Sequence, residues 1–351
     1  MRIFQNLMIL VLTLFFSLSP AASTERKKSQ DYRTFTLYLE NDLFSGSGND
    51  RQYTNGIKLT LISRELERFL NDPLIPGWGR AFIEGLPIGN RPGDQRRISF
   101  SLGQSIYTPD DIKTSKLITD DRPYAGLTYL VIALHGKNIN RKDNLEFDLG
   151  VVGPHSYAEK TQNLVHEIVG SPKPMGWEHQ LADEPIVNLF YERKWRFRQL
   201  DLGGDWSADF IPYLGGSVGN AWTGLNLGGQ VRLGWHLPND FGTFFIRPGS
   251  DNNSPLDESD PRLAETYHRR GAHIFAGLEG SYVARNILLD GNTFCDSHSV
   301  NKKPLLGHFI IGFGLFFERF KISYAYVFQT KAFDNQQEGQ LYGSVTLSYS
   351  F

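Results

Sequence analysis

The alternation of apolar and polar residues is the dominant pattern along the chain, and it is clearest at the C-terminal end. Every second residue there is apolar, and the residues between carry hydroxyl groups: Val345, Leu347, Tyr349 and Phe351 alternate with Ser344, Thr346, Ser348 and Ser350. A period of two is that of a β-strand whose two faces meet different environments. The pattern is typical of a strand with one face toward lipid and the other toward a polar lumen.

Segments with the same alternation recur along the whole chain. They predict about twelve strands: 34–41, 55–63, 97–106, 126–135, 144–152, 185–197, 207–220, 227–238, 271–284, 306–317, 320–331 and 340–351. Bacterial single-chain barrels have an even number of antiparallel strands. We therefore predict an all-β fold, a single transmembrane antiparallel β-barrel of about 12 strands without an internal domain boundary.

The first residues have the pattern of a signal peptide. Arg2 supplies a positive start, residues 7–18 are almost wholly apolar, and small residues follow at 21–23. An apolar run of about a dozen residues is shorter than the roughly 20 that a spanning helix needs. We interpret 1–22 as a signal peptide and 23–351 as an outer-membrane barrel with periplasmic turns and extracellular loops. An uncleaved anchor is the alternative.

Composition narrows the class of protein. The 351 residues include 35 Gly, 25 Phe, 15 Tyr and 6 Trp, with a mean hydropathy of -0.33. Abundant aromatic residues and glycines in a moderately hydrophilic exported chain are typical of a membrane barrel. The formal charge of -2 gives no reason to expect nucleic-acid binding. Cys295 is the only cysteine, so we expect neither an intrachain disulfide nor a thiolate metal cluster.

The order of the strands predicts which loops meet. If the chain starts in the periplasm, the segments 42–54, 107–125 and 153–184 follow odd-numbered strands and lie together at the extracellular mouth. The long connections 64–96 and 239–270 follow even-numbered strands and are expected in the periplasm, where turns are normally short.

The segment 153–170 predicts a short helix at that mouth. Ser156 and Glu159 have the spacing of a capping box, and Gly170 stands where a C-terminal cap belongs. Gln162 and His166 are four residues apart and share one face. A histidine can act as a general base near neutral pH. The alternative is an ordinary surface histidine on a loop helix.

Polar residues also gather on both sides of the first hairpin loop. Asn41 and Asp42 end the first strand, and Asp50, Arg51 and Thr54 precede the second. Such oxygen donors suit Ca²⁺, which could polarise an ester carbonyl. The alternative is that these residues simply form a turn.

Basic residues of the loop 107–125 are candidates for binding substrate phosphates. Arg122, with Lys113 or Lys116, could bind phosphate groups, and a solvated charged loop is the alternative. Residues 215–219 match the G-x-S-x-G pattern of serine hydrolases, but that motif needs a strand-to-helix elbow. The flanking residues predict strand and turn, so we interpret this match as chance.

Several short motifs, in this order and spacing, resemble one known family. They are Asn41-Asp42, Asp50-Arg51, Tyr53-Thr54 with Gly56, Ile106-Tyr107 with Pro109, Asp121-Arg122, Gly153-Pro154, Gln162-Asn163, His166, Trp177 and Gln180. The chain is similar over nearly its whole mature length to the outer-membrane lipid A deacylase family. These are calcium-dependent ester hydrolases that remove the 3′-acyloxyacyl group of lipid A.

The resemblance implies roles for particular residues. His166 would be the base that activates water and Asp42 a Ca²⁺ ligand, while Asn41, Thr54 and Gln162 would shape the metal and oxyanion site. Arg51 would join Lys113, Lys116 and Arg122 in binding substrate. The family has twelve-stranded barrels with the active site between the wall and an extracellular helix.

The sequence departs from the family pattern in two places at the site. An acidic residue expected a few positions after the helix falls on Pro172, and the expected loop lysine corresponds equally well to Lys113 and Lys116.

The function predicted from the sequence is therefore hydrolysis of a lipid A ester in the outer membrane, with lipopolysaccharide as substrate and Ca²⁺ as cofactor. A monomer suffices for this role. The alternatives are an outer-membrane phospholipase that uses a serine, for which no convincing Ser-His pair exists, and a non-enzymatic channel or adhesin.

Overall fold

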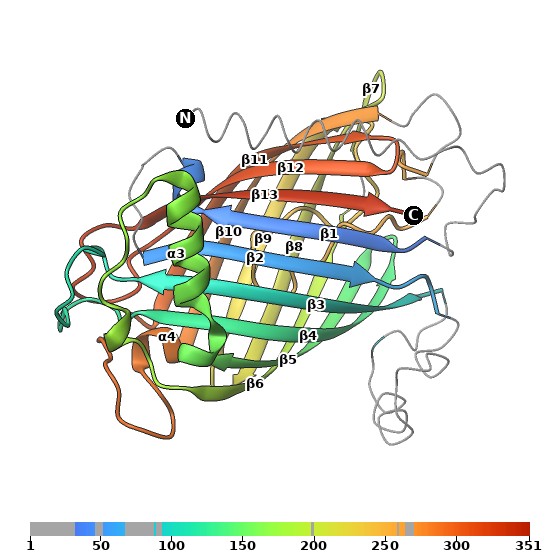
Figure 1. Ribbon diagram of the computed structural model, residues 1–351. Coiled ribbons are helices and arrows are strands. Elements are labelled where there is room, and N and C mark those ends of the chain that lie inside the picture. The colour runs from blue at the N-terminus through green and yellow to red at the C-terminus, as the bar shows by residue number, and fades with distance from the viewer. Residues whose placement is uncertain are drawn as a thin grey trace.

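The strands of the computed structural model form one closed antiparallel barrel (Figure 1). The structure describes residues 32–45, 52–66, 88, 93–197, 200–257, 260–263 and 270–351. The strands are β1 (Thr34–Asn41), β2 (Gln52–Ile62), β3 (Gln95–Thr108), β4 (Ala125–Asn138), β5 (Arg141–Val152), β6 (Glu184–Trp195), β7 (Leu200–Gly203), β8 (Trp206–Gly219), β9 (Trp222–Trp235), β10 (Arg270–Asn286), β11 (Leu305–Phe317), β12 (Phe320–Gln329) and β13 (Gln340–Ser350).

The barrel closes because its first and last strands pair with each other. β1 and β13 run antiparallel, with Thr34 opposite Ser350. On the far side, β6 pairs directly with β8, and the four-residue β7 pairs only with the start of β8. The wall therefore has the twelve strands that the alternation predicts, and β7 is a short addition after β6.

The two faces of the wall differ as predicted. Outward side chains such as Leu130, 57% exposed, and Leu278, 64% exposed, form an apolar belt. Inward side chains are buried and largely polar, and those of neighbouring strands bond to each other, as Thr36 Oγ1 and Ser348 Oγ do at 3.1 Å. An apolar outside and a polar inside are what a barrel in lipid requires.

The lumen is filled by the long connection between β9 and β10, which corrects the expectation that 239–270 lies in the periplasm. Asp251, on this connection, accepts a hydrogen bond from Lys58 Nζ at 3.0 Å and another from Thr60 Oγ1 at 3.0 Å, both inward residues of β2. Asp240 lies within 2.8 Å of Lys321 Nζ on β12. We call the described residues of 236–263 the plug. Its charged groups satisfy inward-facing charges of the wall, which is why so long a connection folds inside.

The ends of β1, β3 and β5 meet at one end of the barrel, which we call the rim. The rim carries the helices η2 (Asp42–Ser45), η4 (Pro154–Ser156), α3 (Ala158–Val169), η5 (Trp177–His179) and α4 (Ile287–Asp290). The loop 109–124 lies at the same end (Figure 1), so the three segments that the strand order brings together do meet there. Among the described residues, no helix has the length and apolar character needed to cross a membrane.

Candidate active site

A row of outward-facing residues crosses the top of the wall at the rim. The strand register aligns Asn41 on β1, Asn55 on β2, Ile106 on β3 and Gly126 on β4. Helix α3 lies in front of these strands, with its N-terminal end on the β5 side (Figure 1). The helix packs on β3 and β4. The outer wall and α3 therefore form the two sides of the site.

The N-terminal end of α3 is fastened to the wall through Ser156. The side chains of Gln104 and Thr128 donate hydrogen bonds to the Ser156 carbonyl oxygen at 2.7 and 2.8 Å. The predicted capping box is wrong. The N-cap is Tyr157, which has a left-handed φ of 58° and no capping side chain, while the Ser156 hydroxyl donates to the Gly153 carbonyl at 2.6 Å. The left-handed turn brings α3 back across the wall.

The inner face of α3 carries three residues, each one turn from the next. Ala158, Gln162 and His166 are 1%, 2% and 4% exposed, so this face is buried against the wall. Trp177 Nε1 donates to Gln162 Oε1 at 2.9 Å and fixes the direction of the amide. The Gln162 Nε2 group is buried and has no hydrogen-bond partner among the described residues. Gln162 therefore offers a donor inside the site.

The imidazole of His166 is held by the backbone of the segment after the helix. Its Nδ1 lies 2.5 Å from the Pro172 carbonyl oxygen. A carbonyl only accepts hydrogen bonds, so Nδ1 carries the proton and the basic lone pair is on Nε2. Gly170, with a φ of 73°, ends the helix as predicted and turns the chain so that Pro172 reaches His166. The position where the family pattern has an acidic residue thus supplies a carbonyl.

The residues at the end of β1 form the polar side of the site. Asn41 Nδ2 donates to the Thr54 carbonyl at 2.8 Å, and Asn41 Oδ1 accepts from the Leu43 backbone at 2.7 Å. These two bonds clamp Asp42, which is 2% exposed, between β1 and β2. Thr54 lies in an irregularity of the β2–β3 pairing and its hydroxyl bonds to Thr108 Oγ1 at 2.9 Å. Arg51 and Asp50 lie outside the described residues.

The oxygen donors near Asp42 suit a hard cation, although they do not by themselves complete a metal site. No group of three or more His, Cys, Asp or Glu side chains suitable for a metal occurs in the part of the chain that the structure describes. Ca²⁺ takes about six to eight oxygens, including hydroxyls, carbonyls and water. Asp42 supplies a carboxylate, and Thr54 supplies a hydroxyl and a carbonyl, so the chemistry of the donors fits.

The predicted phosphate-binding residues lie in two different places. Lys113 and Lys116 are exposed on the loop at the rim. Arg122 is only 5% exposed, and its guanidinium lies over the Tyr107 ring at 4.6 Å, on the lumen side of the wall. Burial lowers the pKa of Arg122, while Tyr107, Asp121 and Asp110 oppose the shift. The sequence does not reveal this inward direction, because it depends on the path of the loop.

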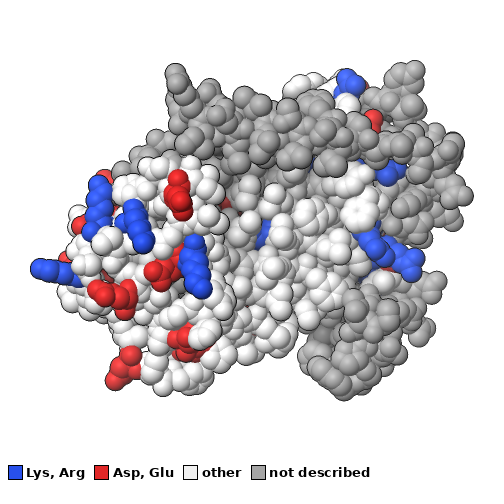
Figure 2. Space-filling model, in the orientation of Figure 1, with Lys and Arg blue, Asp and Glu red and all other residues white. Residues whose placement is uncertain are grey.

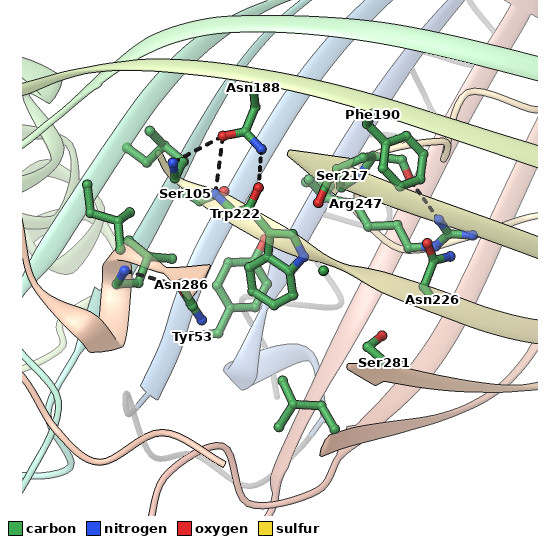
Figure 3. A pocket seen from close by; sticks show the side chains of 18 of the residues that line it. Tyr53, Ser105, Asn188, Phe190, Ser217, Trp222, Asn226, Arg247, Ser281 and Asn286 are labelled. Atoms are coloured by element: carbon green, nitrogen blue, oxygen red, sulfur yellow. Dashed lines mark hydrogen bonds between the residues drawn. The ribbon is translucent and has the colours of Figure 1, made fainter. Parts of the chain in front are cut away.

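A cavity of about 260 Å³ remains in the lumen between the plug and the rim. Tyr53, Trp222 and Arg247 line it and are seen together in Figure 3. Ser217 of the G-x-S-x-G match also lines it and lies near the end of strand β8, where it still pairs with Gly224 of β9 and forms no strand-to-helix elbow. The interpretation of that match as chance is consistent with this position. Alternation alone does not predict the cavity.

Gly126 allows α3 to lie close to the wall. A Cβ atom on Gly126 would lie 2.0 Å from Ala158 Cβ and 2.3 Å from Ser156 Oγ. We expect Gly126→Ala to push the helix away and to lower the rate of ester hydrolysis by about 10²-fold, because small displacements of catalytic groups have effects of that size. Deacylation of lipid A by the purified variant measures this.

The matched control is Gly280→Ala on the outer face of β10, where an added Cβ meets nothing within 4 Å. Both variants should form barrels. Equal activity of the two would contradict the role of close packing between α3 and β4.

The chain was compared with protein families, with curated proteins and with solved structures. The family model described as outer membrane protein LpxR matches residues 8–351. No curated protein sequence matches the chain. The structure of LpxR from Salmonella typhimurium is similar with a TM-score of 0.68 at 18% sequence identity, over 90% of this chain and 99% of that one. The β domain of the Bordetella autotransporter BrkA gives a TM-score of 0.39 at 11% identity, over 91% of this chain and 98% of that one.

The protein is thus an outer-membrane β-barrel with a polar site between its outer wall and a helix at the rim. The chain belongs to the LpxR family, the lipid A 3′-O-deacylases of the outer membrane. The enzyme is an ester hydrolase, as the sequence predicted.

Proposed function

We propose that this chain removes the 3′-acyloxyacyl group of lipid A with a water molecule activated by His166, at a site that also holds Ca²⁺. The observation that carries the proposal is the burial of His166 and Gln162 on the inner face of α3, in front of the row that begins at Asn41. The buried Gln162 Nε2 group has no hydrogen-bond partner among the described residues, and the ester of a lipid headgroup provides an acceptor for it.

His166 is the general base of the proposed reaction. Its Nδ1–H group donates a hydrogen bond to the Pro172 carbonyl. Nε2 can therefore take a proton from water as the water attacks the ester carbonyl. The bond to Pro172 also keeps the ring from turning and stabilises the imidazolium that forms. The proton then passes to the departing sugar oxygen, which leaves a 3′-hydroxyl group on lipid A and releases the acyloxyacyl group as a free carboxylic acid. No covalent intermediate on a serine is involved.

Gln162 and the β1 end stabilise the negative charge that develops on the ester oxygen. The Nε2 group of Gln162 is a buried donor whose direction Trp177 fixes, and such donors are most effective where charge develops. Asp42 and Thr54 would hold Ca²⁺, with Asn41 positioning both. A bound Ca²⁺ supplies Lewis-acid polarisation of the ester carbonyl.

The remaining roles follow from the location of the site. Lys113 and Lys116 are exposed at the rim and are proposed, with Arg51, to bind lipid A phosphates; Arg122 is proposed to support this loop from inside. Residues 1–22 are proposed as a signal peptide. A monomer is the proposed state, because all the groups that the reaction uses belong to one chain.

The experiment that tests the cofactor is a calcium titration of the purified enzyme and of Asp42→Asn. We expect chelation to abolish lipid A deacylation and calcium to restore it. Asp42→Asn should require at least about tenfold more calcium, because the site loses its one assigned carboxylate.

Asp183→Asn is the matched control, since Asp183 is an exposed rim carboxylate that accepts hydrogen bonds from His155. Full activity of the native enzyme in chelator, or an unchanged calcium requirement in Asp42→Asn, would overturn the assignment of Ca²⁺ to Asp42.

A further inference from the structure

Helix α3 has an exposed apolar edge that the catalytic role does not use. Leu164 and Ile168 are one turn apart and are 58% and 71% exposed. Large apolar side chains grouped in this way on a water-facing helix are unfavourable, so the group needs an apolar partner.

The other edge of the same helix is polar. Glu159, Lys160, Asn163 and Glu167 lie there, and three of them are charged. With the inner face of Gln162 and His166 against the wall, the helix divides into three sectors: buried, apolar and polar. Helices with this division lie flat at a lipid–water interface, with the apolar edge in the acyl region.

The direction of α3 determines where its two edges point. The helix crosses the outside of the wall from the β5 side toward the β1 side (Figure 1). The rim loops lie on one side of it, and the middle of the strands lies on the other. A right-handed helix with Gln162 and His166 against the wall then points Leu164 away from the wall and turns Ile168 partly toward the middle of the barrel. The same turn directs Asn163 and Glu167 toward the rim.

The apolar edge continues the lipid-facing belt of the wall. Gln104 and Thr128 bond to the start of α3, and the next outward residues along their strands are Leu102 and Leu130, 50% and 57% exposed. Figure 2 shows the charged side chains gathered at the rim end, around α3, and an almost uncharged surface over the strands beyond it. The apolar belt therefore begins one outward position beyond the polar residues that hold the start of α3.

We propose that Leu164 and Ile168 form a lipid-contact edge that seats the acyl chains of an outer-leaflet lipid beside the site of His166. The ester then reaches His166 from the membrane and not from the aqueous side. The occupant is lipid and not a protein partner, because the edge is continuous with the surface that the barrel already presents to lipid. The catalytic consequence rests on the proposed function, whereas the contact itself does not.

The contact is tested by fluorescence quenching. Cys295 is an exposed free thiol, so Cys295→Ser gives a background without it. A fluorophore is attached to Ile168→Cys or, as matched control, to Glu167→Cys on the adjacent polar edge, and the barrel is folded into vesicles of phospholipid with brominated acyl chains. We expect at least about twofold stronger quenching at position 168 than at 167, since only the apolar edge enters the acyl region. Equal quenching at the two positions would overturn the proposal.

The consequence for substrate is tested with Leu164→Asn/Ile168→Asn and with Glu159→Gln/Glu167→Gln as control. In vesicles, the first double variant should raise KM for lipid A about tenfold with little change in kcat, because it weakens the seating of the chain and not the chemistry. An unchanged KM would contradict the seating role. If the label at position 168 is quenched but the native enzyme cleaves no lipid A, the lipid-contact edge is supported and the proposed function is rejected.

Discussion

Cells that express His166→Ala should keep lipid A with its full set of acyl chains, while cells with the native enzyme lose the 3′-acyloxyacyl group. Removal of a general base lowers a rate by about 10²- to 10⁴-fold. His166 is expected near the upper end, because the bond to Pro172 holds its ring with Nε2 as the basic nitrogen. Mass spectrometry of lipid A measures the loss of acyl mass, and a time course with purified enzyme measures the rate.

His155→Ala is the matched control for this variant. His155 precedes the same helix, but its side chain is 75% exposed and its Nδ1 lies 2.6 Å from Asp183 Oδ2. Both variants must be present in the outer membrane in equal amounts and fold as barrels. Deacylation by His166→Ala at the native rate would reject His166 as the base, and loss of activity in both variants would point to a structural effect on the loop.

The wall of the barrel could be predicted from the sequence because its pattern is local. Each strand needs only an alternation of side chains, and the end of β1 at Asn41 falls where the alternation predicts. β7 was not predicted, because four exposed residues carry too short a pattern to distinguish a strand from a turn. An inward or outward direction follows from the period of two and needs no tertiary information.

The site could be predicted in part because both the order of the strands and the spacing of residues on a helix follow from the sequence pattern. Strand order brings Asp42 and His166 to the same rim, and the four-residue spacing puts Gln162 and His166 on one face. The capping of α3 could not be predicted in the same way. Its left-handed N-cap at Tyr157 depends on close packing against Gly126, which the local Ser156-Glu159 spacing does not contain.

The plug is the part of the fold that the sequence pattern misplaces. Apart from the aromatic stretch at 241–246, its residues are largely polar and aperiodic, which is typical of an exposed loop. They enter the barrel because charged side chains inside the wall, far apart in sequence, need partners there, as Lys58 does with Asp251. The same filling weighs against the channel alternative, since a conducting barrel requires an open polar lumen and this one is occupied by its own chain.

The plug also gives the largest expected effect on stability, at Asp240. This carboxylate is buried and lies 2.6 Å from Arg232 Nη1, 3.0 Å from Arg262 Nη2 and 2.8 Å from Lys321 Nζ. Asp240→Asn should lower the free energy of unfolding by about 3–5 kcal/mol, because it leaves buried cations without their shared counter-charge. Lys321 is affected most, since Arg232 and Arg262 keep Asp209 and Asp260. Urea unfolding in vesicles, followed by tryptophan fluorescence, measures the change.

Asp240 also makes a defined contribution to the pH dependence of the protein's stability. Burial alone would raise the pKa of Asp240, but Lys321, Arg262 and Arg232 outweigh it and hold the pKa well below its usual range. A carboxyl group with a lowered pKa stabilises the fold above its unfolded value of about 3.9, and this contribution is lost as the pH falls toward the folded value. The stabilisation from Asp240 should therefore be constant between about pH 5 and 7 and decline in stronger acid.

Two further variants separate the charge effect from a general loss of packing. Asp240→Asn/Lys321→Met removes the carboxylate together with the cation that depends on it, and should recover part of the lost stability, because a buried pair replaced as a whole costs little. Asp201→Asn, on the exposed strand β7 where the carboxylate accepts a hydrogen bond from the Gly203 backbone, should change stability by less than about 0.5 kcal/mol. If Asp240→Asn unfolds at the same urea concentration as the native protein, the ion pairs of the plug do not hold the plug in the lumen. Contacts of its uncharged residues must then do so.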